Sequence, residues 1–313
     1  MREILERAAR DRGSLPHMSV TRGFKKLEDD DFHKRILLIA NRPQDYRINN
    51  DRVVAYTAPM KATGTHAYMV PFAGDLGLNE RESDAYIREL NKKFSTFFGM
   101  GGDDIDLRLY GKSVEDSINF NPTRDRFETR LTHLKLKTIE EKQVLPVPQY
   151  LAGVPRVDRY FGTCRAEEMC GLETGFNFRT DIRGHGGIND LEGNTKSQNP
   201  KSKLHDLEVT EGSLFWELTG RPTGWIKVYS AHRQCLLRSS NARLKVSAVH
   251  PHDSCIEAIE SADRNILGVQ GHFEWQAIRV DGENAALAKQ FMRNVIVWGT
   301  PMRHKCKMAL AAY

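Results

Sequence analysis

The stretch RYFGTCRAEEMCGLETG, residues 159–175, decides the fold because it predicts a buried strand that turns sharply into a helix. Aromatic residues typical of a strand lead into Gly162, and the run from Arg165 onward is typical of a helix. Cys164 stands at the junction between them. A thiol at a helix N-terminus feels the positive end of the peptide dipoles, which favours the nucleophilic thiolate. The stretch therefore predicts a reactive cysteine at a strand-to-helix turn.

Such a turn exposes its central side chain above the sheet edge, as in a nucleophile elbow. It also aims the next backbone N–H, that of Arg165, at the oxyanion formed when the thiolate attacks a carbonyl. A cysteine that attacks an amide still needs a proton for the departing amine. A nearby imidazole can take the thiol proton and later give it to that amine.

The second informative stretch is GVQGHFEW, residues 268–275, in which a short apolar run leads to a histidine and a glutamate two positions apart. Side chains two apart in an extended strand share one face, so we expect Glu274 to lie beside His272. A carboxylate there fixes the tautomer and orientation of the imidazole. We therefore predict that Cys164, His272 and Glu274 lie close together.

Around these two stretches, short β-rich runs alternate with helical ones, which indicates an α/β sheet. Helices are expected near Asp84–Phe94, from an Asn121 N-cap with Pro122 in the first turn, and over Asn284–Trp298 up to Gly299. Further strands are expected at RILLIA (35–40), RVVAYTA (52–58), HAYMVPF (66–72), STFFG (95–99), WIKVYS (225–230), LKVSAVH (244–250), CIEAIE (255–260) and NILGVQ (265–270).

Bulk composition narrows the class of protein and its partners. The 313 residues are 40% hydrophobic and 28% charged, and the net charge of +5 is spread along the chain, so we expect no nucleic-acid partner. No window approaches eighteen apolar residues, so we expect no membrane span. Five cysteines, an odd number without CxxC or zinc-ligand spacing, favour a reducing, cytoplasmic setting. The DDID run, residues 103–106, lacks a recognised ligand spacing, so we assign no metal.

One domain is expected over residues 35–299, with an N-terminal extension at 1–34 and a tail at 300–313. Residues 185–203 are rich in Gly, Asn, Ser and Lys and predict a long surface loop. Such a loop is either a lid at the edge of a substrate site or a tolerated insertion.

Several ordered motifs together resemble the class I glutamine amidotransferases, and within them the γ-glutamyl-γ-aminobutyrate hydrolase-like branch, peptidase family C26. The resemblance spans roughly residues 35–298. The family's PGGxDVxPxxYG, DPxRDxFE, GICRGxQ, VNSxHHQ and GVQWHPEW are similar to MGGDDIDLRLYG (100–111), NPTRDRFE (121–128), GTCRAEE (162–168), VYSAHRQ (228–234) and GVQGHFEW (268–275). Five motifs in one order are far more specific than any one of them.

The resemblance implies a flavodoxin-like three-layer α/β/α sandwich with a mostly parallel central sheet. It implies Cys164 as nucleophile, His272 as base and acid, and Glu274 as the group that orients His272. Backbone N–H groups near Gly102 and Arg165 would form the oxyanion hole. The positions that would contact the substrate are Gly101, Glu168, His232 and Gln234.

The chain departs from the family pattern around these positions. Ala166 stands where the family has glycine, and its methyl group is expected to crowd the elbow or the approach of substrate. Glu168 stands where many members have glutamine, and a carboxylate there would repel an α-carboxylate and attract an α-ammonium. The other replacements are Tyr229 for Asn, Arg233 for His, Gly271 for Trp and Phe273 for Pro.

The activity implied is cysteine-dependent hydrolysis of a γ-glutamyl amide bond, in glutamine or a γ-glutamyl amine, through a γ-glutamyl thioester on Cys164. Its partner would be a small-molecule γ-glutamyl substrate, and no cofactor is expected. Two alternatives stay open: a glutaminase subunit that supplies ammonia to a separate synthetase or ligase, and a non-catalytic binding protein of the same fold. A homodimer is also left open.

Overall fold

The computed structural model describes residues 36–39, 51–65, 67–70, 77–113, 120–143, 157–180, 182, 185 and 204–300. The expected N-terminal extension lies outside the described residues, as do residues 186–203 of the expected loop and 301–313 of the expected tail. The division into extension, domain and tail therefore stays a prediction.

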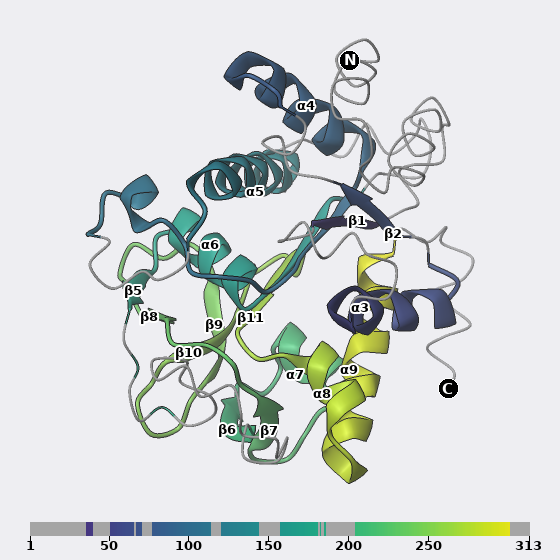
Figure 1. Cartoon of the computed structure of the whole chain (residues 1–313). Helices are drawn as coiled ribbons and strands as arrows, with labels where there is room; N and C mark the ends of the chain where they lie inside the picture. The colour runs from purple at the N-terminus through teal and green to yellow at the C-terminus, as the bar shows by residue number, and fades with distance from the viewer. Residues whose placement is uncertain are drawn as a thin grey trace.

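In the described part of the chain, eleven strands form one sheet, shown in Figure 1. The order along its main path is β2-β1-β3-β4-β11-β10-β9-β6-β7, with β5 and β8 paired to its side. The strands are β1 (Ile36–Ile39), β2 (Ala67–Val70), β3 (Thr96–Gly99), β4 (Arg159–Thr163), β5 (Asn177–Arg179), β6 (Leu204–Val209), β7 (Ile226–Tyr229), β8 (Cys235–Leu237), β9 (Lys245–Val249), β10 (Ile256–Glu260) and β11 (Ile266–Val269).

The sheet has a parallel half and an antiparallel half. The five strands from β2 to β11 run parallel, and those from β11 to β7 pair antiparallel. In the parallel half, Gly99 of β3 pairs with Gly162 of β4, and Thr163 pairs with Val269 of β11. The turns that follow β3, β4 and β11 therefore meet at one edge, which is where open α/β sheets place their ligand sites.

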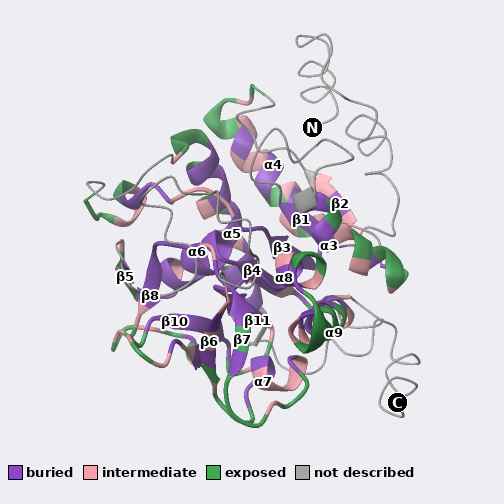
Figure 2. Ribbon diagram, turned by 60° about the horizontal axis from the view of Figure 1, so that its bottom comes forward, coloured by how far each residue is buried: buried purple, intermediate pink, exposed green. Residues whose placement is uncertain are grey.

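Helices cover both faces of the sheet (Figure 1), which confirms the three-layer fold. They are α3 (Asp51–Ala62), α4 (Glu80–Lys93), η4 (Leu107–Tyr110), α5 (Pro122–Gln143), α6 (Arg165–Glu173), α7 (Leu214–Leu218), α8 (Phe273–Arg279) and α9 (Gly282–Gly299). Successive strand residues face opposite layers: Phe97 packs in the core with α4 and α5, whereas Phe98 packs in the core with α3 and α9. Figure 2 shows the buried strands between helices whose outer faces are exposed.

The expected strand over RVVAYTA is wrong, because residues 51–62 form the helix α3. Its buried residues Val53, Tyr56 and Met60 recur at helical spacing. The topology gives the physical reason: β1 and β2 pair in parallel, and parallel neighbours need a crossover connection, usually a helix. The β-branched pair at 53–54 favours a strand locally, but the crossover outweighs that preference.

The predicted start of a helix agrees best with the structure where its N-cap residue was recognised in the sequence. Asn121 accepts hydrogen bonds from the backbone N–H groups of Thr123 (3.1 Å) and Arg124 (3.2 Å), so α5 begins at Pro122 as predicted. The helix α4 instead begins at Glu80, four residues before the predicted start. Its cap is a reciprocal pair between Asn79 and Glu82 that the sequence analysis missed.

The expected strands over WIKVYS, LKVSAVH, CIEAIE and NILGVQ are confirmed as β7, β9, β10 and β11. The final helix, α9, ends at Gly299 as expected and buries Phe291 and Val295. Among the described residues, no helix combines the length and apolar character needed to cross a bilayer.

Candidate active site

Cys164 occupies the sharp turn between β4 and α6. Its backbone has φ 52° and ψ −116°, in the region that residues with side chains rarely adopt. Its N–H donates to the carbonyl of Val269 on the neighbouring strand (2.7 Å), which holds the turn against the sheet. The predicted strand-to-helix elbow is therefore present, and α6 begins at Arg165, directly after the cysteine.

Two glycines make room for this elbow and for Ala166. A β-carbon placed on Gly99 would lie 2.5 Å from the Ala166 β-carbon, and one on Gly162 would lie 2.7 Å from the Ala166 carbonyl carbon. The Tyr160 hydroxyl donates to the Ala166 carbonyl (2.9 Å) and fixes the first turn of α6. The elbow thus forms with the Ala166 methyl in place, contrary to the expected crowding. Its effect on substrate approach stays a prediction.

The turn after β3 brings Cys164 and His272 to one point. A β-carbon on Gly101 would lie 2.7 Å from Cε1 of the His272 ring and 3.3 Å from the Cys164 β-carbon. Any side chain at position 101 would therefore collide with the imidazole. Cys164 and His272 are each 5% exposed, so a polar reaction there proceeds with little bulk water present.

His272 is held by backbone and side-chain contacts. The ring nitrogen Nδ1 lies 2.6 Å from Glu274 Oε1, and both side chains are buried. The backbone N–H of His272 donates to the Tyr229 carbonyl (2.8 Å). The expected contact is present, but the strand geometry used to predict it is wrong. β11 ends at Val269, and His272 instead caps the helix α8, whose first turn carries Glu274.

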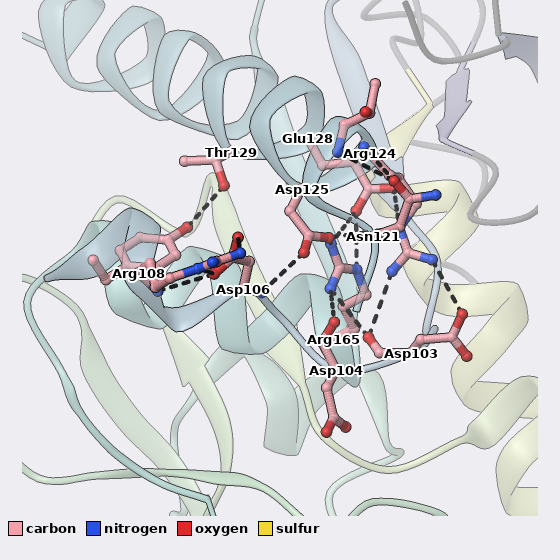
Figure 3. Close-up of polar contacts among 12 residues, drawn as sticks. Asp103, Asp104, Asp106, Arg108, Asn121, Arg124, Asp125, Glu128, Thr129 and Arg165 are labelled. Carbon is pink, nitrogen blue, oxygen red and sulfur yellow. Dashed lines mark hydrogen bonds and ion pairs between the residues drawn. The ribbon is translucent and has the colours of Figure 1, made fainter. Parts of the chain in front are cut away.

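The side chain of Arg165 ties the elbow to the glycine turn (Figure 3). Its guanidinium, 1% exposed, donates to the carbonyls of Asp103 (3.0 Å) and Asp104 (2.8 Å). It also pairs with Glu128 (3.0 Å) and with Asp125, both on α5. The sequence predicts a role only for the backbone N–H of Arg165, because the partners of its side chain lie about 40 to 60 residues away in the chain.

A second arginine completes the network drawn in Figure 3. Arg124 lies 3.5 Å from an Asp103 carboxylate oxygen and 3.4 Å from Glu128 Oε1. Asp125 accepts the backbone N–H of Asp106 through its other oxygen (2.9 Å). The charged residues of the NPTRDRFE stretch thus hold the MGGDDID turn in place, which explains why two motifs without nucleophiles accompany the elbow.

Gly102 lies in the turn between Gly101, which adjoins Cys164 and His272, and Asp103, whose carbonyl accepts from Arg165. Gly102 follows Gly101 in the turn, and Arg165 is the first residue of α6, where N–H groups have no partner within the helix. Their roles as oxyanion donors, like the catalytic roles of Cys164, His272 and Glu274, stay predictions.

Glu168 differs from the carboxylate that the sequence analysis expected. It is 3% exposed, and burial raises its pKa to about 8, although a hydrogen bond from Gln270 Nε2 (3.0 Å) lowers it. At pH 7 the group is mostly a neutral carboxylic acid. A neutral acid resembles glutamine in shape and in offering both a donor and an acceptor. The raised pKa therefore favours the neutral acid over the carboxylate that the expected repulsion requires, and the effect of Glu168 on substrate stays a prediction.

The other departures from the family pattern also have structural partners. Arg233 forms an ion pair with Asp104, so it provides a third tie on the glycine turn. Gly271 leaves no room for a side chain, because a β-carbon there would lie 2.3 Å from Val228 Cγ2. Phe273 stacks in the core with Phe291 at 4.2 Å between ring centroids.

Two predicted substrate contacts, His232 and Gln234, lie in the turn between β7 and β8. His232 lies in a second buried cluster of histidines, with His185, His205 and His250. Its Nδ1 donates to the Gln234 carbonyl (2.8 Å), and both residues are buried. Their contact with substrate, like that of Gly101 and Glu168, stays a prediction.

Comparison with known families is consistent with this geometry. Residues 150–274 match the family model Peptidase C26, a span that contains Cys164, His272 and Glu274. The expected resemblance to peptidase family C26 is therefore confirmed over residues 150–274. A search of curated proteins finds no match.

Several solved structures share the fold of this chain. A glutamine amidotransferase from Thermotoga maritima is 11% identical, with 86% of this chain and 99% of that chain covered at a TM-score of 0.51. The glutaminase domain of Trypanosoma brucei CTPS, with bound acivicin, is 13% identical (83% and 92% covered, TM-score 0.52). A Thermoplasma acidophilum protein described as one subunit of GMP synthase is 12% identical (90% and 99% covered, TM-score 0.50).

Proposed function

We propose that this C26-like chain hydrolyses γ-glutamyl amide bonds, with Cys164 as nucleophile. The observation that carries the proposal is the convergence of Cys164 at a positive-φ elbow with a buried imidazole whose far nitrogen is held by Glu274. A thiol, a base and a group that orients the base are the parts that acyl transfer by a cysteine requires. The peptidase family match supports a hydrolytic reaction.

The proposed reaction has two halves. His272 takes the Cys164 proton, and the sulfur adds to the γ-carbonyl carbon of the substrate. When the C–N bond breaks, His272 gives its proton to the departing amine or ammonia, and a γ-glutamyl thioester remains on Cys164. His272 then takes a proton from water, whose oxygen attacks the thioester, and glutamate leaves as Cys164 recovers its proton.

Positioning of the oxyanion donors falls to Arg165. Its guanidinium bonds two carbonyls of the glycine turn, so the N–H groups of that turn and of the elbow keep a fixed separation. Preorganised donors stabilise the tetrahedral intermediate without reorganisation during the reaction. The neutral form of Glu168 supports a substrate role like that of the glutamine in related enzymes, because it offers the same hydrogen-bonding pattern.

The experiment is a screen of glutamine and γ-glutamyl amines for glutamate release by the purified chain. Cys164→Ser is the test variant and Cys170→Ala its control, because Cys170 lies one helical turn and a half further along α6 and is fully buried in the core. We expect release that Cys164→Ser abolishes and Cys170→Ala preserves. Release that survives in Cys164→Ser would overturn the proposal.

An ammonia-supplying subunit is the second candidate. It is favoured by the neighbours, because one is described as part of a synthase and another as a glutaminase domain. A stand-alone hydrolase turns over fully by itself, whereas a subunit stays slow until its synthetase binds. Slow release from glutamine alone, with no faster γ-glutamyl amine in the screen, would favour the subunit.

A non-catalytic binding protein is the third candidate. It requires that no γ-glutamyl compound is hydrolysed and that Cys164 resists glutamine-analogue electrophiles such as diazo-oxo-norleucine or acivicin. The presence of Cys164, His272 and Glu274 in one buried arrangement argues against it, since binding alone does not require a nucleophile, a base and its orienting carboxylate.

A further inference from the structure

A second polar cluster lies among the antiparallel strands, with none of the predicted catalytic residues in it. His205 comes from β6, Glu257 from β10, and His232 from the turn between β7 and β8. His185 approaches from the segment after β5. All four side chains are buried, and their ligand-type atoms lie within 4.8 Å of one another.

Several of these atoms are buried without a hydrogen-bond partner: His232 Nε2, Glu257 Oε2, and both ring nitrogens of His205. Buried polar atoms nearly always have a partner, and each one without a partner costs free energy of folding. Two imidazoles and a carboxylate with unsatisfied atoms, beside the hydrogen-bonded imidazole of His185, therefore indicate a missing ligand. A ligand that accepts electron pairs suits this cluster, because the Glu257 carboxylate and one nitrogen of each neutral imidazole carry lone pairs.

The spacing fits a metal ion. His185 Nε2 lies 3.0 Å from Glu257 Oε1, His205 Nε2 lies 3.3 Å from Glu257 Oε2, and His232 Nε2 lies 3.6 Å from Glu257 Oε1. A tetrahedral site with bonds of about 2.0–2.1 Å separates its ligand atoms by roughly 3.3 Å. The observed separations bracket that value, so small shifts of the side chains would admit an ion.

Outer contacts fix two of the three rings, those of His185 and His232, in the tautomers that a metal needs. His232 Nδ1 must carry the proton, because it donates to the Gln234 carbonyl (2.8 Å), and this leaves the Nε2 lone pair toward Glu257. His185 Nδ1 faces the Asp253 carboxylate at 2.6 Å, and Asp253 is itself held by His250 Nδ1 (2.9 Å) and the Cys255 N–H (3.1 Å). Carboxylates and carbonyls bonded to the far nitrogen are the usual outer partners of metal-bound histidines.

We propose that His185, His205, His232 and Glu257 bind one divalent transition-metal ion, Zn²⁺ first among them. The donor set of three imidazoles and one carboxylate suits zinc in preference to Mg²⁺ or Ca²⁺, which select oxygen ligands. Four buried protein ligands leave no position for substrate, so the site is structural. It joins four segments that are far apart in the chain, from residue 185 to residue 257, on the antiparallel side of the sheet.

The competing account is a buried ionic network without metal. Burial lowers the pKa of His185, but hydrogen bonds to Cys255, Glu257 and Asp253 outweigh it and raise that pKa to about 10. A protonated His185 would then neutralise one of the two carboxylates. This network leaves His232 Nε2 and the His205 ring nitrogens without a hydrogen bond, although His205 Nε2 lies 3.3 Å from Glu257 Oε2, whereas one metal ion would bind the Nε2 atoms of both rings.

The test uses the full-length chain without a histidine tag, purified, stripped with a chelator and titrated with Co²⁺ and Zn²⁺. We expect one equivalent of Co²⁺ to give the intense visible absorption of a tetrahedral site, and one equivalent of Zn²⁺ to displace it. X-ray absorption of the Zn²⁺ form should show nitrogen and oxygen neighbours without sulfur. Sulfur neighbours, or no binding near one equivalent, would overturn the proposal.

Variants then assign the site. Glu257→Gln and His205→Ala should lose the stoichiometric Co²⁺ band and the rise in Tm that Zn²⁺ gives to the unaltered chain. His252→Ala is the matched control, because His252 is exposed, contacts His250 and lies outside the four donors. It should retain both. Retention of the Co²⁺ band in Glu257→Gln and His205→Ala would contradict the assignment. If either variant fails to fold, the visible absorption of the Co²⁺ form and the X-ray absorption of the Zn²⁺ form of the unaltered chain still decide the donor set.

Discussion

The elbow at Cys164 and the histidine cluster at Glu257 are both buried polar sites on one sheet, yet they are built differently. The elbow lies where the turns after three parallel strands meet, and short contiguous motifs carry its residues. The histidine cluster lies among antiparallel strands, and four distant segments contribute one residue each. Catalytic geometry here depends on local backbone shape, whereas the cluster depends on the completed fold. The two sites should therefore respond separately to substitution.

The largest expected effect separates them directly. Cys164→Ala should lower glutamate release by at least about 10⁴-fold, because removal of a nucleophile removes the covalent path. Its metal content should not change. Conversely, Glu257→Gln should lose the metal and still react at Cys164 with diazo-oxo-norleucine. Metal analysis and mass spectrometry on both variants check this, and a loss of metal in Cys164→Ala would show that the sites are not separate.

Arg165→Lys tests whether the side-chain tie on the glycine turn matters to the reaction. Lysine keeps the charge but cannot reach two carbonyls and two carboxylates with one planar fork. We expect a fall of roughly 10- to 100-fold in kcat, since displaced oxyanion donors weaken the transition state. The free energy of unfolding should fall by about 3 kcal/mol, as for other buried ion pairs.

Arg243→Lys is the control for this substitution. Arg243 pairs with Glu140 at 3.2 Å on the exposed surface, where such pairs contribute less than about 1 kcal/mol. Its kcat should match that of the unaltered chain. Equal effects of the two substitutions would show that the Arg165 network is not specific to the active site.

Glu168→Gln probes the neutral acid beside the elbow. Because the folded pKa of about 8 is above the ordinary value of 4.5, the folded chain holds a proton that the unfolded chain has lost over that range. The stability from this group is complete below pH 4.5 and is lost as pH rises through 8. The variant should therefore gain stability over the unaltered chain by up to a few kcal/mol at pH 9 and by little at pH 5.

The same substitution changes the pH dependence of activity. At pH 7 both forms should release glutamate at similar rates, and only the unaltered chain should lose activity as pH rises through 8. Unfolding curves at pH 5 and 9 and rates from pH 5 to 9 test this, and identical alkaline limbs would refute the role of Glu168.

The smallest effect is expected for the N-cap of α4, whose partner residue belongs neither to the elbow nor to the histidine cluster. Asn79 is exposed and caps α4 through the half-buried Glu82. Asn79→Ala should lower the free energy of unfolding by about 1 kcal/mol and leave rate and metal content unchanged. Denaturant unfolding with glutamate and metal assays provides the check, and a change in either assay would link α4 to function.

The elbow could be predicted from the sequence because its backbone requirements are local. Gly162 and Cys164 are themselves part of the turn, and the order of the motifs indicated which distant histidine lies beside it. The contact of His272 with Glu274 was expected for the wrong reason, because a two-residue spacing also permits contact at the start of a helix. The prediction for residues 52–58 was wrong because it used the local strand preference of β-branched residues. The helix there is required by the crossover between two parallel strands, which the local sequence does not reveal.

The histidine cluster could not be predicted in the same way. His185, His205, His232 and Glu257 are separated by 20 or more residues, so no ligand spacing appears in the sequence. His185 stands at the start of a polar run that predicts a surface loop, yet the side chain is buried. The protonation of Glu168 likewise depends on burial by the whole fold, not on its neighbours in α6.

The central claim is that Cys164 is the nucleophile, and intact-mass analysis after reaction with diazo-oxo-norleucine, followed by peptide mapping, tests it most directly. The account predicts one adduct per chain, located on Cys164, that forms more slowly in His272→Ala and is absent from Cys164→Ser. An adduct on Cys170, Cys235 or Cys255, or glutamate release from a chain whose Cys164 stays unmodified and replaceable, would contradict it.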